Sequence, residues 1–357
     1  MPKKIISSDT SYRDKFAISQ SAIKDWKIMT PMKWYKTWVT RELSRPDPTA
    51  TTIGSFLDCL LFTPDDIEKR FVVSQTTPPS EKVQLILSAV LTHFEQLNAH
   101  TALLDVKVPH KEPTLDDKDL VMSLCIEHEH YKNKPEQGYN DVVKKGAEYF
   151  EFLKSINGRK VISPADNIIA VELKKVLMEN PVSKPFFIPK KDCEVFFQTY
   201  IYDNYDVDGF DNLEFLPIKG ALDIIHVNHK LKQVREVDEK FTESPYPGFY
   251  DRIKQMDYPL QHSFYDRLLK KWTKQHYKGY SVMPPLNLVI DDTDKIPYLY
   301  MYDLDDLYIK EHGLEGTPIK GWKHSIEEIA WHFNSEDWSR PREHQLNGYF
   351  HVKTFRK

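Results

Sequence analysis

Alternating polar and apolar residues predict a β-hairpin near the middle of the chain. Its strands are Ala221–Val227 and Gln233–Phe241, joined by a short turn at Asn228-His-Lys. Successive side chains of a strand point to opposite faces. Val237 and Phe241 therefore lie on one face of the second strand. The other carries three charged residues, Glu236, Asp238 and Lys240.

Apolar residues at every fourth position predict a helix shortly after the hairpin. The helix begins near Asp257 and runs to about Gln275, and its buried stripe consists of Leu260, Phe264, Leu268 and Trp272. Gln261 and Tyr265 are also four residues apart, so they project together beside that stripe.

Further strands and helices complete an α/β pattern. Strands are predicted from Glu194 onward, where Glu194 shares a face with Gln198, and over Leu286–Asp291 and Tyr298–Asp303, a pair that suits a sheet edge. Helices are predicted over Glu81–Leu97, over two segments within 138–181, and after Ser21, a candidate N-cap. The pattern predicts a mixed sheet flanked by helices.

The hairpin also carries candidate chemistry. Asp223 ends one strand, and Asp238 and Lys240 lie on its neighbour. Carboxylates hold Mg²⁺ through hard oxygen ligands, and a lysine beside them can orient or deprotonate an attacking water. This arrangement is typical of phosphodiester hydrolysis. A charged strand edge that faces water has the same pattern, so both interpretations are open.

The order of strand with Asp, strand with Asp-x-Lys, and helix with Gln-x-x-x-Tyr resembles the core of the PD-(D/E)XK nuclease superfamily, in its RecB and lambda-exonuclease branch. Three N-terminal segments are similar to the opening of the exonuclease VIII (RecE-like) family of phages and prophages. They are the serine-led helix over 17–26, the Thr-Pro-x-x-aromatic step from Thr30, and the Gly-Ser helix from Ile53 to Pro64. The match is strong there and in the hairpin, and weak over Ser74–Lys134.

The resemblance implies a Mg²⁺-dependent deoxyribonuclease, with Mn²⁺ as a substitute. Such an enzyme degrades double-stranded DNA from an end, 5′ to 3′, and leaves a 3′ single strand for recombination. Asp223 and Asp238 would bind the metal, with the Glu239 backbone carbonyl completing the shell. Lys240 would position the water. The DNA backbone would be held near the cut by Gln261 and Tyr265. Related enzymes work with a single-strand annealing protein, and some form rings around DNA.

Two positions depart from the family pattern or are ambiguous within it. Asp58 stands where the family has histidine, on a helix with apolar neighbours. It is either a replacement metal ligand or a structural carboxylate paired with a lysine or arginine. Glu194 is the candidate for the family's upstream glutamate, with Gln198 as the alternative polar group. An exposed glutamate at the start of a strand is an equal interpretation.

The substitution at Asp58 leaves a second class of function open. In that interpretation the chain is a catalytically weakened DNA-binding accessory protein of recombination that keeps the fold. An endonuclease of the same superfamily is a further alternative.

Composition sets the remaining limits. The chain has 357 residues and is interpreted as one nuclease domain. Residues 1–72 would be its N-terminal helices, 74–181 a helical elaboration, and 185–357 the catalytic sheet with its helix and C-terminal strands. No stretch of 18 apolar residues predicts a membrane span. The three cysteines lack paired spacing, which favours a reducing cytoplasm, that of a bacterial host if the protein is phage-encoded.

The net charge of −4 does not by itself indicate a nucleic-acid-binding protein. Local basic segments with interleaved aromatic residues are the candidates for DNA contact, namely Lys24–Lys36 and Arg267–Lys278. Amphipathic helix faces explain these segments equally well.

Overall fold

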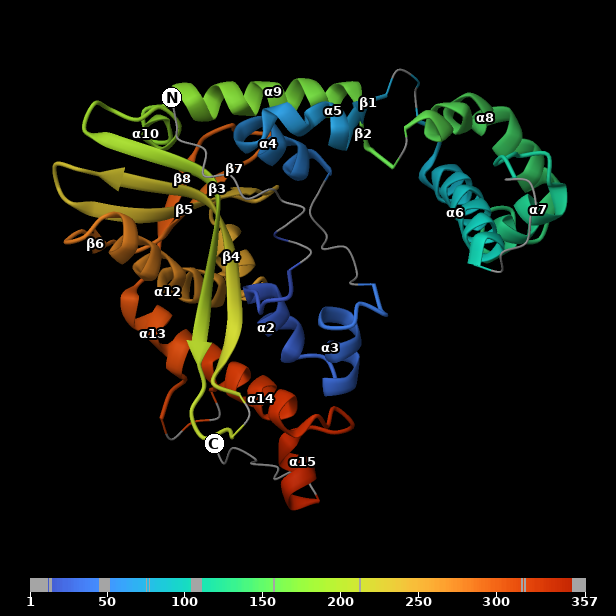
Figure 1. Cartoon of the computed structure of the whole chain (residues 1–357). Coiled ribbons are helices and arrows are strands. Elements are labelled where there is room, and N and C mark those ends of the chain that lie inside the picture. The colour runs from blue at the N-terminus through green and yellow to red at the C-terminus, as the bar shows by residue number, and fades with distance from the viewer. Residues whose placement is uncertain are drawn as a thin grey trace. The chain divides into compact units, whose positions relative to one another are not determined.

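The computed structural model describes residues 12, 15–44, 52–74, 76, 78–103, 111–156, 158–211, 213–315, 317 and 319–348. The chain divides into two compact units (Figure 1). The first unit combines Met1–Thr63 with Val171–Lys357, and the second is Pro64–Ala170. Each unit has its own buried apolar cluster.

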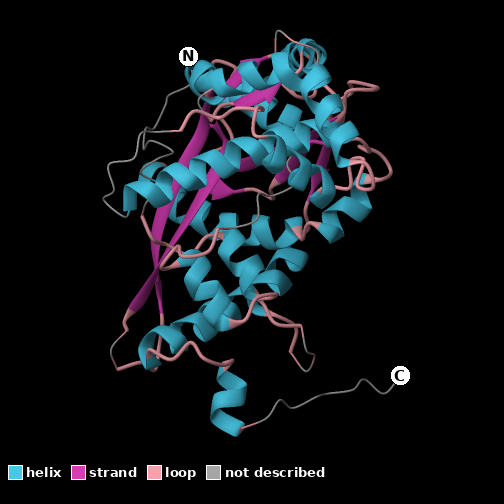
Figure 2. Cartoon of the chain, turned by 90° about the vertical axis from the view of Figure 1, so that its right-hand side faces the viewer, coloured by secondary structure: helices cyan, strands magenta, loops and turns pink. Residues whose placement is uncertain are grey.

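The first unit is built on a mixed sheet in the strand order β3-β4-β5-β7-β8, with the short strand β6 also paired to β5. The strands are β3 (Cys193–Asp206), β4 (Phe215–Asn228), β5 (Gln233–Phe241), β6 (Ser281–Val282), β7 (Leu286–Ile290) and β8 (Tyr298–Met301). Neighbours are antiparallel except where β5 meets β6 and β7, which run parallel to it. The long strands β3 and β4 extend beyond the rest of the sheet (Figures 1 and 2).

Helices flank this sheet, so the fold class is α/β, as the sequence predicts. They are α2 (Gln20–Trp26), α3 (Pro31–Trp38), α4 (Thr52–Phe62), α10 (Lys184–Phe187), α11 (Phe249–Gln255), α12 (Tyr258–His276), α13 (Leu304–His312), α14 (Trp322–Ser335) and α15 (Arg342–Asn347). The helix α12 packs against β3, β4 and β5. The helix α4 also contacts β5.

The second unit is mainly helical. Its elements are η1 (Pro64–Asp66), α5 (Ile67–Arg70), β1 (Phe71–Val73), α6 (Glu81–Leu103), α7 (Lys118–Glu127), α8 (Pro135–Ser155) and β2 (Lys160–Ile162). The strands β1 and β2 form a parallel pair. Buried apolar residues of α6, α7 and α8 make up its core. The helix α9 (Pro164–Glu179) spans the boundary between the two units.

The predicted hairpin and the predicted Gln261 helix are confirmed as β4–β5 and α12. All four residues of the predicted apolar stripe of α12 are buried. The predicted C-terminal strand pair is also present, but β7 is buried along its whole length between β5 and β8, and of this pair β8 lies at an edge of the sheet.

The predicted N-cap at Ser21 is wrong. The helix α2 begins at Gln20, and the hydroxyl of Ser19 accepts a hydrogen bond from the backbone N–H of Ala22 at 3.3 Å. Two serines two residues apart offered the same capping chemistry, and the backbone conformation decided between them.

Gly220 of β4 allows α12 to approach the sheet closely. A Cβ atom at this position would lie 2.6 Å from Cδ1 of Leu268 and 3.0 Å from the ring of Tyr265. Both are buried residues of α12. Any side chain here would push the helix and the strand apart.

We expect Gly220→Ala to lower the free energy of unfolding by ~1–3 kcal/mol, because it overpacks a well-filled interface. Urea denaturation measures this cost. If the contact with Leu268 is responsible, the same substitution should cost less in a Leu268→Ala background. Equal costs in the two backgrounds would contradict the steric explanation.

Candidate active site

The buried carboxylate of Asp238 lies at the centre of the candidate site. It is 3% exposed and receives hydrogen bonds from two neighbouring elements. The amide of Gln261 on α12 donates to its Oδ1, and the amide of Asn287 on β7 donates to its Oδ2, each at 2.9 Å. The ammonium of Lys240 lies 2.5 Å from the same Oδ2. Three side chains therefore fix the orientation of this carboxylate.

Asp223 lies on β4, beside Asp238. Each carboxyl group forms a side-chain hydrogen bond with the other, so the pair can share a proton. The amide of Gln198 on β3 donates to Oδ1 of Asp223 at 3.1 Å. Gln198 has a φ of +44°, which is unusual for a residue other than glycine. Strained backbone of this kind is typical of functional sites.

Two further carboxyl groups approach Asp223. Asp58, a half-buried residue of α4, is close to Glu239 and to Asp223. Glu239 is 3% exposed, and its Oε1 atom has no hydrogen-bond partner within the described part of the chain. The structure thus brings together four acidic side chains, from α4, β4 and β5.

These contacts shift the pKa values in opposite directions. Burial raises the pKa of Asp223 and of Glu239 well above the usual range, and the neighbouring carboxylates add to the effect. Burial also acts to raise the pKa of Asp238, but Lys240 and His262 reverse this, and its pKa is lowered. Asp238 and Asp223 raise the pKa of Lys240 against the effect of burial. Lys240 therefore stays protonated beside the neighbouring carboxyl groups.

Glu236 and His262 form a buried pair close to Asp238. Oε1 of Glu236 and Nδ1 of His262 are 3.1 Å apart, and neither side chain is more than 1% exposed. Glu236 precedes Asp238 by two residues, and His262 follows Gln261 directly. The Glu236–His262 pair therefore connects β5 to α12, next to the hydrogen bond between Gln261 and Asp238.

A second contact fixes the amide of Asn287. The hydroxyl of Tyr302 donates a hydrogen bond to Oδ1 of Asn287, which leaves the Asn287 Nδ2 group to donate to Asp238. His262, Asn287 and Tyr302 were not predicted as site residues. The position of His262 beside Gln261 was the one sequence signal available for any of them.

Gln261 and Tyr265 lie in the interface between α12 and the sheet, and both are 7% exposed. The Gln261 side chain contacts Asp238, whereas the Tyr265 ring lies over Gly220. Burial raises the pKa of Tyr265 well above the usual range. Both predicted site residues therefore lie close to Asp238 or to its strand neighbour β4, buried between α12 and the sheet.

Glu194 lies away from this centre. Its Oε2 accepts a hydrogen bond from the Tyr277 hydroxyl at 2.6 Å, and its Oε1 is 3.6 Å from Nε2 of His229. In the sheet it pairs with Val227, four residues along β4 from Asp223. Gln198, the alternative on the same strand, is the residue that contacts Asp223.

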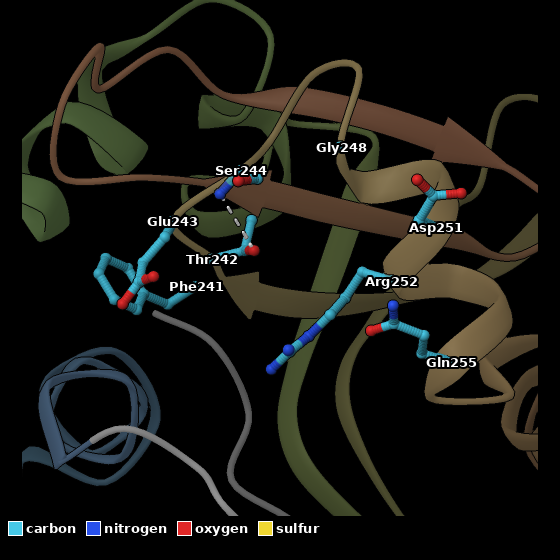
Figure 3. Close-up of a pocket in the computed structure, with 8 residues that line it drawn as sticks. All are labelled: Phe241, Thr242, Glu243, Ser244, Gly248, Asp251, Arg252 and Gln255. Carbon is cyan, nitrogen blue, oxygen red and sulfur yellow. Dashed lines mark hydrogen bonds between the residues drawn. The ribbon is translucent and has the colours of Figure 1, made fainter.

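A cavity of about 420 Å³ opens between the end of β5 and α11 (Figure 3). Its wall begins at Phe241 and includes the hydroxyl groups of Thr242 and Ser244. Figure 3 shows the Arg252 side chain extending from α11 into this space, with Gln255 next to it. The cavity thus offers one cation, the two carboxylates of Glu243 and Asp251, and several hydrogen-bonding groups.

Within the described residues, no group of three or more His, Cys, Asp and Glu side chains is already arranged to hold a metal ion. No helix in that part of the chain is long and apolar enough to cross a membrane. A comparison with protein-family models finds no match to this sequence, and a comparison with curated proteins finds none either.

We expect Glu236 and His262 to be strongly coupled. Replacing either one by leucine should cost about 3–5 kcal/mol of stability, because the partner is left buried and uncompensated. The double leucine variant should cost less than the two single variants together. Urea denaturation of all four proteins measures the coupling. The exposed Lys118–Glu136 ion pair is the control and should show almost none. Additive losses at Glu236 and His262 would contradict the pairing.

We expect Asp223→Asn to stabilise the protein in EDTA at pH 8. Because folding raises the pKa of Asp223, this group favours the folded state below its unfolded pKa, and that contribution is lost as pH rises through the folded pKa. The stability gain of the variant over wild type should therefore shrink as pH falls from 8 to 5. Unfolding curves across that range test it, and a pH-independent loss of stability would contradict it.

Proposed function

We propose that this chain is a divalent-metal-dependent deoxyribonuclease with a core of the PD-(D/E)XK kind. One observation carries the proposal. Asp223 and Asp238 lie on adjacent strands with their carboxyl groups hydrogen-bonded to each other, and Lys240 lies against Asp238. Paired carboxylates can hold the metal for phosphodiester hydrolysis, and a lysine beside them can orient the attacking water.

The residues present fit a hard cation such as Mg²⁺ or Mn²⁺. Four acidic side chains lie together with Lys240 against one of them, Asp238, and Oε1 of Glu239 has no partner within the described residues. Added positive charge would relieve the repulsion that raises the pKa of Asp223 and of Glu239. We propose Asp223 and Asp238 as ligands, with the Glu239 carbonyl and Asp58 completing the set. When bound, the metal supplies an activated water and stabilises charge on the phosphate.

Lys240 acts as a cation in this proposal. Its ammonium lies 3.1 Å from the Glu239 carbonyl oxygen as well as against Asp238. Because neighbouring carboxylates raise its pKa, it holds its proton at neutral pH. It would orient the attacking water and stabilise the developing negative charge, and a role as the base that removes the water's proton is disfavoured.

Gln261 would act through Asp238, because its amide is already bonded to that carboxylate. Tyr265 would fix the distance between α12 and the sheet at Gly220. Because Gln261 and Tyr265 are buried, we propose that the cavity at the end of β5 contacts the DNA backbone directly, through Arg252 and the hydroxyl groups of Thr242 and Ser244. Action on double-stranded ends, the 5′ to 3′ direction and a role in recombination rest on the resemblance to exonuclease VIII.

A second candidate function has its own support. Both oxygens of Asp238 are satisfied by protein donors, and no ready-made metal group exists in the described part of the chain. A DNA-binding accessory protein that has lost catalysis would have this appearance. Incubation with linear and with closed circular DNA, each with and without Mg²⁺, separates exonuclease, endonuclease and accessory protein.

We expect Lys240→Ala to lower the single-turnover cleavage rate by ~10²–10⁴-fold, because an electrostatic and positioning group is lost next to the phosphate. Affinity for a DNA end, measured in Ca²⁺ to prevent turnover, should change little. The exposed Lys175 provides the matched control, and Lys175→Ala should alter neither quantity. Cleavage at the wild-type rate in Lys240→Ala would sink the nuclease proposal.

A further inference from the structure

A second cavity, of about 240 Å³, lies at the C-terminal end of α12. Three lysines and three hydroxyl-bearing residues line it, namely Lys270, Lys274, Lys278, Thr273, Tyr277 and Tyr280. No carboxylate is among the described residues that line it. In a chain with 49 basic and 53 acidic residues, this local excess of positive charge makes the cavity a candidate anion site.

The hydroxyl of Thr273 is the most informative group in this cavity. The residue is 2% exposed, and its Oγ1 atom has no hydrogen-bond partner within the described residues. A helical threonine commonly bonds to the carbonyl four residues earlier, but Thr273 does not. A buried hydroxyl left without a partner is costly, so a ligand that accepts its hydrogen bond would be stabilised.

The lysines differ in their pairing. Lys270 forms an ion pair with Asp266 at 2.6 Å. Lys274 and Lys278 form no ion pair with any residue that the structure describes. Two exposed lysines without an ion-pair partner in the described part of the chain therefore line the same cavity as the Thr273 hydroxyl.

Contacts of their hydroxyl groups and rings hold Tyr277 and Tyr280 in place on one side of the cavity. The Tyr277 hydroxyl bonds to Glu194 at 2.6 Å, and the Tyr280 hydroxyl lies 3.1 Å from Nδ1 of His229. The two rings also contact each other, with centroids 5.4 Å apart. Cations, a free hydroxyl and a rigid wall together favour a phosphate group over a large apolar ligand.

Stabilisation of the helix end is the simpler explanation for some of these lysines. Positive charge near the last turn of a helix offsets the helix dipole. That effect accounts for Lys274 but not for the unsatisfied Thr273 hydroxyl or for Lys278, which lies beyond the end of α12 at His276.

The position of the cavity relative to the carboxyl cluster suggests its ligand. Gln261 contacts Asp238 near the start of α12, and Lys274 lies near the end of the same helix. The separation is about 20 Å at 1.5 Å per residue. This corresponds to roughly six base steps of duplex DNA.

We propose that this cavity, which we call the Thr273 site, binds a backbone phosphate of the DNA, roughly six base steps from the bond that is cut. The inference rests on the proposed nuclease function. Because one rigid helix carries both the Thr273 site and Gln261, the bound strand would be held at a fixed distance from the carboxyl cluster.

The contribution of the two lysines is tested by measuring the affinity for a linear DNA duplex in Ca²⁺ over a range of salt concentrations. Lys274→Ala/Lys278→Ala should weaken binding about tenfold or more and reduce the salt slope by about one, since the site neutralises one phosphate and each phosphate contact contributes roughly one. The control Lys174→Ala/Lys175→Ala removes the same charge from α9 and should leave the slope unchanged. Equal effects of the two variants would overturn the proposal.

Thr273→Val tests the hydroxyl itself. Removing an unsatisfied buried hydroxyl should leave the melting temperature unchanged or raise it, yet weaken DNA binding. A lower melting temperature with unchanged DNA binding would make the hydroxyl structural and overturn the proposal.

Calorimetry with inorganic phosphate distinguishes a free anion from DNA as the source of the phosphate. If phosphate binding is lost in Lys274→Ala/Lys278→Ala while DNA binding is unchanged, the site serves a free anion and the DNA proposal is wrong. If wild type cleaves DNA but none of these variants alters DNA binding, the Thr273 site fails and the nuclease function stands. If wild type neither binds nor cleaves DNA, the proposed function fails, and the Thr273 proposal with it.

Discussion

The hydrogen bonding of one buried carboxylate, Asp238, constrains the whole first unit. A carboxylate this deep is stable when donors and a counter-ion surround it. Here they come from three elements: Lys240 on β5, Gln261 on α12 and Asn287 on β7. Each element must therefore lie within hydrogen-bonding distance of the same two oxygen atoms. The close helix–sheet approach at Gly220 allows this for α12, and the strand order β5-β7 allows it for Asn287.

The acidic cluster around Asp238 opposes the stability of the fold. Asp223 and Glu239 are held where burial and like charges raise their pKa values, so their charged forms destabilise the folded state. The large apolar cluster of the first unit offsets this cost, because α12 contributes several fully buried residues to it. A cost in stability of this kind is common at functional sites.

Sequence periodicity was sufficient for the hairpin, for α12 and for the grouping of Asp238 with Lys240, since each depends on neighbours along the chain. It was not sufficient for residues whose role depends on tertiary partners. Asn287 meets Asp238 through a parallel pairing between strands far apart in sequence, and no local pattern marks it. Gln198 and Glu194 share one strand, and the cross-strand register decided which of them contacts Asp223.

The path of the chain along β5 has a consequence for how the acidic centre can vary. Val234 pairs with Val282 of β6 and Val237 with Leu286 of β7, so the β6–β7 side has one residue more than β5 over this interval. The extra residue falls at Met283-Pro284-Pro285, where proline is tolerated because the ladder is broken. If residues 283–285 all paired in a continuous ladder, with no bulge, Leu286 instead of Asn287 would lie opposite Asp238. Divergence or redesign could therefore disable this centre through an uncharged, proline-containing connection, with every acidic residue and lysine unchanged.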